Sequence, residues 1–154
     1  MDLQVGALAP SFTLPGADGR LVGLLDHLGR KVVLFFYPKD DTSGCTQEAK
    51  EFDMLSRDFA ASGTAVIGMS PDSPKSHGKF SGKHGLGLTL LSDETTDTLN
   101  AYGVWVEKSM YGRKYMGVER TTVLIGADGC VARIWPKVKV PGHAAEVLAA
   151  ANAL

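Results

Sequence analysis

Cys45 is the residue whose type and position in this sequence most clearly suggest chemistry. It follows the apolar run 32–37, then Pro38 and a polar segment that ends at Gly44, so we expect it in the first turn of a helix. The N-terminus of a helix presents unpaired N–H groups and a partial positive charge, and thiols placed there ionise readily. The thiolate is the nucleophilic form of cysteine. The spacing therefore predicts a reactive cysteine between a strand and a helix.

Two other residues near Cys45 could support that reactivity. We expect Thr42 to be the N-cap of the helix, with its hydroxyl accepting a hydrogen bond from the backbone N–H of Cys45. Pro38 ends the strand and would form the edge of a pocket. Each residue alone has an ordinary structural explanation, since caps, strand-ending prolines and small buried cysteines are common. The three together favour an activated nucleophile.

Apolar strands alternate with helical stretches along the chain, which predicts an α/β fold. The apolar strands 32–37 and 65–69 favour a parallel sheet covered on both faces, with a right-handed crossover through a helix over 43–61. The other predicted elements are an N-terminal hairpin over 12–23, helices over 74–84, 95–102 and 142–152, a strand over 88–91, a loop over 104–116 and a hairpin over 121–135. The length favours one domain spanning residues 1–154.

The composition argues against several classes of partner. The chain has 16 basic and 17 acidic residues, a net charge of −1 and no basic stripe, so neither nucleic acid nor an anionic membrane is expected. It has no apolar run of membrane-spanning length and no recognisable signal peptide, so we expect a cytoplasmic protein. The four histidines are scattered and lack ligand spacing to cysteine, so we expect ordinary surface or partly buried histidines, without a metal or other cofactor.

The sequence resembles the peroxiredoxins, and within them the group called peroxiredoxin Q or bacterioferritin comigratory protein. The match is Pro38-x-x-x-Thr42-x-x-Cys45 inside FYPKDDTSGCTQEAKEF, and it extends to APSFTLPGADGR and KYMGVERTTVLIGADG. This resemblance implies a thioredoxin-like fold with a central mixed β-sheet flanked by helices and an N-terminal β-hairpin. It also implies the thiol-dependent reduction of hydrogen peroxide or organic hydroperoxides.

The resemblance implies a role for each matching residue. Cys45 is the peroxidatic nucleophile, Thr42 binds the peroxide through its hydroxyl, and Pro38 shields the thiolate. Arg120 is the cation beside Cys45, which suits a guanidinium because it stays charged and presents several donors in one plane. Glu48 either orients Arg120 through a carboxylate contact or is an exposed first-turn residue that complements the helix dipole.

The sequence departs from the family at the resolving cysteine. Many members carry it five positions after the peroxidatic one, where this chain has Lys50, and the other family location falls within 73–84, which contains no cysteine. Cys130 remains, but it is about seven residues along the hairpin from Arg120, roughly 20 Å at about 3.3 Å per residue. A disulfide needs Cα atoms within about 7 Å. We therefore predict that Cys45 forms a sulfenic acid, which an external small thiol, thioredoxin or glutaredoxin resolves.

Other functions stay open at this point. A peroxide sensor or a redox-regulated, chaperone-like protein would use the oxidation of Cys45 as a signal. A cysteine hydrolase would need a histidine base, for which His84 and His143 are candidates. A thioredoxin-type reductase is disfavoured because Glu48, and not cysteine, stands three positions after Cys45. We expect Tyr37 to support the site by packing and not as an acid, Lys50 to be a solvated helix residue, and the protein to be a monomer.

Overall fold

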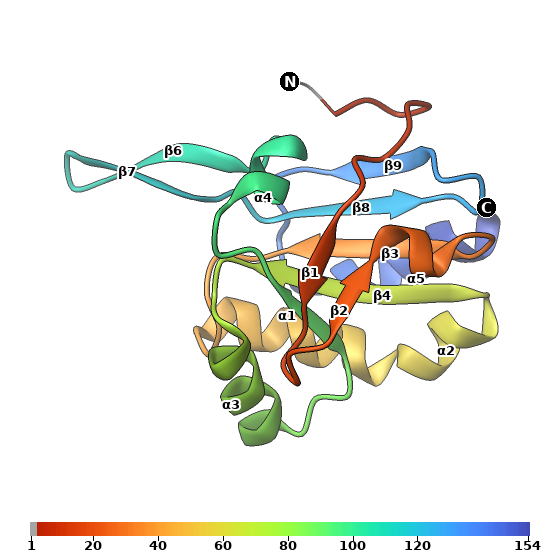
Figure 1. Cartoon of the computed structure of the whole chain (residues 1–154), viewed down its shortest axis with the longest axis horizontal. Helices are drawn as coiled ribbons and strands as arrows, with labels where there is room; N and C mark the ends of the chain where they lie inside the picture. The colour runs from red at the N-terminus through yellow and green to blue at the C-terminus, as the bar shows by residue number, and fades with distance from the viewer. Residues whose placement is uncertain (1–2) are drawn as a thin grey trace.

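The computed structural model describes residues 3–154, so the first two residues of the predicted domain lie outside the described part. Its centre is a five-stranded mixed sheet with the strand order β5-β4-β3-β8-β9 (Figure 1). The parallel strands are β3 (Lys31–Phe36), β4 (Thr64–Ser70) and β5 (Thr89–Ser92), and the antiparallel ones are β8 (Thr121–Ile125) and β9 (Val131–Trp135). The predicted parallel sheet is thus confined to three strands, and the whole sheet is mixed.

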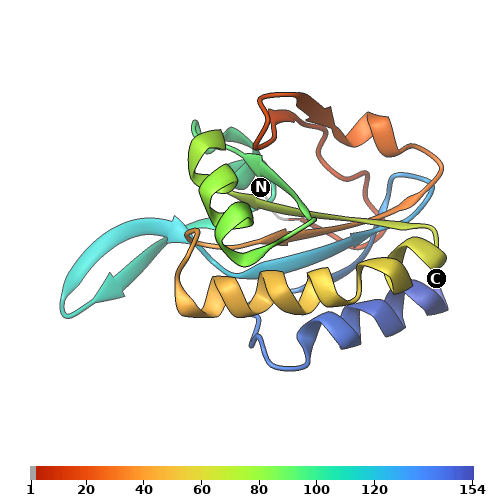
Figure 2. The same cartoon turned by 90° about the horizontal axis from the view of Figure 1, so that it is seen from below.

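Helices and a small hairpin cover the two faces of this sheet. One face carries α1 (Ser43–Met54), α2 (Ser56–Ala61) and α5 (His143–Ala153) (Figure 2). The other carries the predicted N-terminal hairpin of β1 (Thr13–Pro15) and β2 (Leu21–Gly23), with η1 (Leu24–His27) and α4 (Asp97–Ala101). Helix α3 (Pro74–His84) has the predicted bounds and lies beside the edge strand β5.

Strand β3 is buried on both faces, which explains its continuous apolar sequence. Val33 and Phe35 belong to the cluster shared with α1 and α5, whereas Leu34 and Phe36 belong to the cluster on the opposite face. Successive side chains of a strand point to opposite faces of the sheet, so a strand between two helical layers needs apolar residues at every position. The end of β3 therefore lies deep in the molecule, where a reactive group can be kept from water.

The predicted helix over 43–61 is wrong in one respect, because it is broken at Leu55. This residue has φ −97° and ψ 8°, away from helical values, and its N–H donates to the carbonyl of Phe52 in a tight turn. Helix α2 then packs along β4 and keeps Phe59 buried. The apolar repeat continues through the break, so the repeat alone does not show it.

The predicted loop over 104–116 is instead a β-hairpin that projects from the body of the molecule (Figure 1). It is formed by β6 (Trp105–Met110) and β7 (Arg113–Val118), and Tyr111 and Gly112 make the turn with φ +52° and +77°. Two consecutive left-handed residues are typical of a tight hairpin turn whose twist matches its strands.

Within residues 3–154, no helix combines the length and apolarity needed to cross a bilayer.

The packing predicts a strong effect of adding one methyl group at Gly68 in β4. A Cβ there would lie 2.6 Å from Phe35 Cζ and 2.7 Å from Leu90 Cδ2, both in buried side chains. Overpacking of this kind costs about 1–3 kcal/mol, so we expect Gly68→Ala to lower the free energy of unfolding by that amount in urea.

Gly78→Ala is the matched control for this prediction. A Cβ at this exposed position of α3 would meet nothing within 4 Å. Because alanine favours helix over glycine by up to about 1 kcal/mol, the control is expected to keep or raise stability. An unchanged unfolding free energy in Gly68→Ala would contradict the packing described for β4.

Candidate active site

Cys45 lies in the first turn of α1, as the sequence predicts, and its side chain is 1% exposed. Helix α1 begins after the loop 37–42, and the first helical hydrogen bond runs from the N–H of Thr46 to the carbonyl of Thr42. The sulfur therefore lies at the positive end of the helix, close to the end of β3.

One guanidinium contacts two side chains of α1. Arg120 donates from Nη2 to Cys45 Sγ at 3.3 Å and from Nη1 to Glu48 Oε1 at 2.7 Å. Burial by itself would lower the pKa of Arg120, but the charges of Glu48 and Cys45 raise it, so the guanidinium stays charged. The structure thus brings Cys45, Arg120 and Glu48 together.

Glu48 is buried and contacts Arg120, so the exposed alternative considered from the sequence is wrong. Its side chain is 1% exposed, and burial raises its pKa to about 7 although Arg120 opposes the shift. Its second oxygen, Oε2, has no hydrogen-bond partner among the described residues. Because a buried carboxylate needs compensation, Glu48 is held to Arg120 and fixes the guanidinium in turn.

Gly44 provides the space that Arg120 occupies. A Cβ on Gly44 would lie 3.2 Å from Arg120 Nη2, which is tighter than ordinary van der Waals contact. The guanidinium can therefore reach Cys45 over the backbone of Gly44 without a side chain in between. The sequence gives no direct sign of this requirement, because a glycine before a helix also suits an ordinary turn.

The predicted hydrogen bond of Thr42 is wrong. Thr42 is the N-cap residue, but its hydroxyl donates to the carbonyl of Lys39 at 2.8 Å and makes no capping bond to the helix. A hydroxyl at this position can bind either the helix N–H groups or a carbonyl in the preceding turn, and here the turn provides the partner. The hydrogen of Thr42 Oγ1 is thereby engaged, while its lone pairs remain available as acceptors.

The remaining predicted residues lie around this centre. Pro38 is half-buried at the start of the loop, and Lys50 is exposed on α1, as expected for a solvated residue. Tyr37 is buried, stacks with Phe35 at a ring-centroid distance of 5.7 Å and donates to Asp40 at 2.6 Å. Burial and the neighbouring Asp40 carboxylate raise the pKa of Tyr37 far above its usual value, in line with the predicted packing role.

Cys130 lies at the opposite end of the sheet from Cys45. Thr121 at the start of β8 pairs with Phe36, whereas Gly126 just beyond the end of β8 donates its N–H to the carbonyl of Cys130. Six residues of extended chain separate Arg120 from Gly126, about 20 Å at 3.3 Å per residue. Both cysteines are free thiols in the structure.

No described histidine hydrogen-bonds to Cys45, whose side-chain partner is Arg120. Two of them, His77 and His143, are buried, so the prediction of surface or partly buried residues is wrong for these. Each described histidine has its own hydrogen-bond partner, and the pairs are His27 with Arg30, His77 with Asp40, His84 with Asp41 and His143 with Thr122. The hydrolase alternative therefore gains no support from the described residues.

Comparison with known proteins gives the family. The sequence pattern of the AhpC/TSA family matches residues 5–134. The chain belongs to this family. It is 49% identical over 148 residues to the putative peroxiredoxin bcp of Coxiella burnetii, covering 96% of this chain and 98% of the relative. It is 45% identical over 148 residues to peroxiredoxin Bcp of Bacillus subtilis, covering 96% and 94%.

Solved structures agree with this membership. A structure of the Xanthomonas campestris bacterioferritin comigratory protein, described in terms of its alkyl peroxide reduction, has a TM-score of 0.90 at 41% identity, covering 98% of this chain and 96% of that one. A mutant of Xylella fastidiosa peroxiredoxin Q has a TM-score of 0.93 at 37% identity, with the same coverage. The predicted thioredoxin-like fold and peroxiredoxin Q group are confirmed, and the protein is a thiol-dependent peroxidase.

Lys108 is a residue of this peroxiredoxin that the sequence reasoning missed. It is half-buried on β6, and a Cβ at Gly117 would lie 3.2 Å from its Cδ, so the side chain crosses the hairpin over Gly117. Burial and the charge of Arg120 lower its pKa, while Cys45 and Glu119 act in the opposite direction. Recognising residues 105–118 as a hairpin would have directed attention to this second cation near Cys45.

Titration of Glu48 predicts a pH-dependent stability difference. The unfolded chain releases this proton near pH 4.5, whereas the folded protein keeps it until about pH 7, so the folded state loses stability as pH rises through this window. Glu48→Gln removes the titration. As pH rises from about 4.5 to about 7, the wild type should lose unfolding free energy relative to Glu48→Gln. The difference should reach up to about 3 kcal/mol in favour of the variant.

Urea unfolding at a series of pH values measures this difference for Glu48→Gln. Lys50→Gln serves as the control on the same helix, because its side chain is exposed and its difference should stay flat. A constant offset between Glu48→Gln and the wild type would show that burial of Glu48 does not shift its titration.

Proposed function

We propose that this peroxidase works through a sulfenic acid on Cys45 that an external thiol resolves. The observation that carries the proposal is the contact of Cys45 Sγ with Arg120 Nη2 at 3.3 Å at the N-terminus of α1. This contact places a permanent cation and helix N–H groups beside a buried sulfur. The second free cysteine, Cys130, lies at the far end of the sheet.

The first step is a displacement at a peroxide oxygen. The Cys45 thiolate attacks one oxygen, the S–O bond forms, and the O–O bond breaks with its electron pair leaving on the other oxygen. The leaving hydroxide or alkoxide then takes a proton and departs as water or an alcohol. Arg120 and the α1 N–H groups act on the negative charge as it moves from sulfur to oxygen, and this stabilises the transition state more than the ground state.

Thr42 and Pro38 complete the substrate site in this proposal. The Thr42 hydroxyl donates to the Lys39 carbonyl, so it meets a bound peroxide as an acceptor of the peroxide O–H. The half-buried Pro38 shields the thiolate from water. Glu48 acts through Arg120, and Tyr37 supports the loop by packing.

The second stage requires a thiol from outside the chain. The sulfenic sulfur of Cys45 is attacked by an external thiolate, which forms a mixed disulfide and releases hydroxide that is protonated to water. A second thiol then releases the Cys45 thiolate and leaves as a disulfide. A thioredoxin, a glutaredoxin or a small thiol can supply both equivalents. The exposed Lys50 stands where many relatives of this group carry the resolving cysteine.

Four further features belong to this proposal. The protein acts as a monomer and as one domain, as the resemblance to its group suggests, and it works in the cytoplasm, where thiol reductants are abundant. It requires no metal or other cofactor, because the sulfur, the guanidinium and the hydroxyl perform the chemistry described above.

Serine variants of the two cysteines test the chemistry. Cys45→Ser should abolish thiol-dependent peroxide consumption, because a hydroxyl at this position does not ionise as a thiol does. Cys130→Ser should keep nearly the wild-type rate. Loss of turnover in Cys130→Ser, with the first oxidation intact, would identify Cys130 as a resolving residue.

The wild-type protein distinguishes a peroxidase from a sensor in the same assay. A wild-type protein that is oxidised once and then stops would be a sensor and not a peroxidase.

The role of Thr42 predicts a difference between two of its variants. Thr42→Val removes the hydroxyl at similar volume, so the second-order rate of Cys45 oxidation should fall about 100- to 1,000-fold. Thr42→Ser keeps the hydroxyl and should retain most of the rate. Stopped-flow measurement with hydrogen peroxide gives both values. Equal rates in the two variants would exclude the hydroxyl from the reaction.

A further inference from the structure

We propose that the buried pair of Asp40 and His77 is a positioning pair, which holds the loop before α1 so that Thr42 and Cys45 meet the peroxide correctly. This inference rests on the proposed role of Cys45. Neither residue contacts the sulfur, so the pair acts through the loop 37–42. His77 belongs to α3, and the pair therefore couples the reactive cysteine to a helix at the edge of the sheet.

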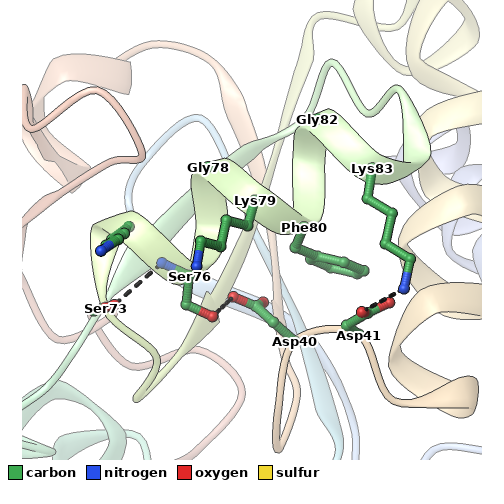
Figure 3. A pocket seen from close by; sticks show the side chains of 10 residues that line it. Asp40, Asp41, Ser73, Ser76, Gly78, Lys79, Phe80, Gly82 and Lys83 are labelled. Atoms are coloured by element: carbon green, nitrogen blue, oxygen red, sulfur yellow. Dashed lines mark hydrogen bonds and ion pairs between the residues drawn. The ribbon is translucent and has the colours of Figure 1, made fainter.

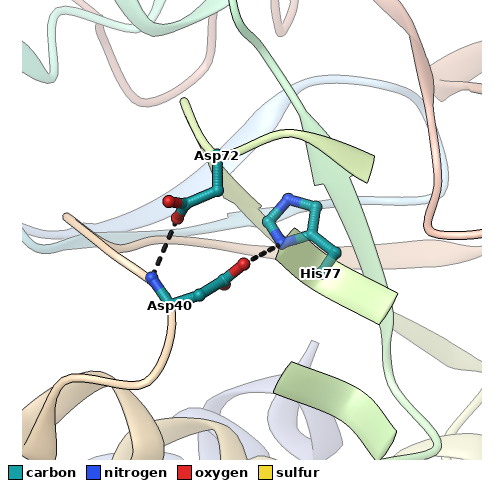
Figure 4. Close-up of side chains that lie close together, drawn as sticks. All are labelled: Asp40, Asp72 and His77. Carbon is teal, nitrogen blue, oxygen red and sulfur yellow. Dashed lines mark hydrogen bonds and ion pairs between the residues drawn. The ribbon is translucent and has the colours of Figure 1, made fainter. Parts of the chain in front are cut away.

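Asp40 is the point at which three elements meet. Its carboxylate accepts hydrogen bonds from Tyr37 Oη at 2.6 Å and Ser76 Oγ at 2.7 Å. It also lies 2.8 Å from His77 Nδ1 (Figure 4). Its backbone N–H donates to Asp72 Oδ2 at 2.8 Å, after the end of β4. Burial alone would raise the pKa of Asp40, but the donors from His77, Tyr37 and Ser76 lower it, so the carboxylate stays ionised.

Both ring nitrogens of His77 lie within hydrogen-bonding distance of oxygen atoms. Its side chain is fully buried, and Nε2 lies 3.1 Å from the carbonyl oxygen of Leu91, which can only accept. Nδ1 faces the Asp40 carboxylate, and the Tyr37 hydroxyl already donates its hydrogen to Asp40. His77 and Asp40 therefore form a buried hydrogen-bonded pair.

The side chains of Asp40, Asp72 and His77 lie close together, but they do not leave ligand atoms free for a metal ion. Ligand atoms of Asp40, Asp72 and His77 lie within 4.8 Å of one another. However, Asp72 Oδ2 accepts from both Ser70 Oγ and the Asp40 N–H, and Asp40 Oδ2 accepts from Ser76 and His77. The polar atoms are engaged with each other, as in a network that fixes backbone positions.

The loop between Asp40 and Cys45 transmits this position directly. Lys39 precedes Asp40, and the Lys39 carbonyl accepts the hydrogen of Thr42 Oγ1. Asp41 has φ +61°, a left-handed conformation that turns the chain into α1. A shift of Asp40 therefore moves the partner of the Thr42 hydroxyl and the first turn of the helix. A misplacement of about 1 Å in such a site can lower a rate about 100-fold.

Asp41 offers a matched control in the same loop. Its carboxylate binds Lys83 at 2.8 Å (Figure 3). It also binds His84 at 2.8 Å, so it ties the loop to the end of α3 as well. Asp41 is exposed, whereas Asp40 is buried. Exposed pairs contribute little, while removing one partner of a buried pair leaves an uncompensated charge. Comparing variants of the two neighbouring aspartates therefore distinguishes a positioning effect of Asp40 from simple attachment of the loop to α3.

The experiment compares two reactions of Cys45 in Asp40→Asn, His77→Gln, the double variant and Asp41→Asn. Oxidation by hydrogen peroxide requires an aligned Thr42 and Arg120, whereas alkylation by iodoacetamide requires only an accessible thiolate. We expect peroxide oxidation to fall about 10- to 100-fold in both single variants, with alkylation changed less than about threefold. The double variant should lose no more than either single one, because the two residues act as a unit.

Several outcomes would overturn the proposal. These are an unchanged peroxide rate in Asp40→Asn, an equal loss in both reactions, or an equal loss in Asp41→Asn. If a variant of the pair does not fold, Tyr37→Phe removes one donor to Asp40 and keeps the ring, and it should show a smaller loss confined to peroxide. The wild-type oxidation rate tests the role of Cys45 itself, so failure of the proposed function is distinguishable from failure of the positioning pair.

Discussion

The rest of the active site depends on the bridge from Arg120 to Cys45 and Glu48. That bridge exists because β8 runs antiparallel to β3, so the start of β8 lies beside the end of β3, with Thr121 opposite Phe36. Arg120, one residue earlier, then lies against the first turn of α1. The same register carries Cys130 to the other end of the sheet. One strand pairing thus places the guanidinium of Arg120 beside Cys45 and places Cys130 at the far end of the sheet.

Buried carboxylates hold the site on two sides. Glu48 pairs with Arg120 along α1, and Asp40 pairs with His77 beneath the loop. Burying charges is costly, and such pairs contribute little net stability compared with apolar packing. They contribute orientation instead, because each carboxylate reaches its partner only in one arrangement of the loop and the helix. The sulfur is thereby held in a fixed geometry while the apolar layers around β3 exclude water.

The sequence predicted those parts of the structure that depend on local pattern. The apolar run of β3, the helix α3 with its serine cap and Pro74, and the position of Cys45 all follow from neighbours in the chain. The contact of Arg120 with Cys45 was expected from the family resemblance and not from local pattern. The burial of His77 was missed because it depends on Asp40, 37 residues away. The hydroxyl of Thr42 had two possible partners within three residues, and pattern alone does not choose between them. The hairpin of β6 and β7 was missed because its turn, Tyr-Gly, lacks the commoner Asn or Asp.

The central claim is that Cys45 completes its oxidation without a partner in its own chain. Intact mass spectrometry after one equivalent of hydrogen peroxide tests this directly. We predict a gain of one oxygen, about 16 Da, located on Cys45 and removed by added thiol through a mixed disulfide. A loss of about 2 Da, with a disulfide joining Cys45 to Cys130, would contradict the account.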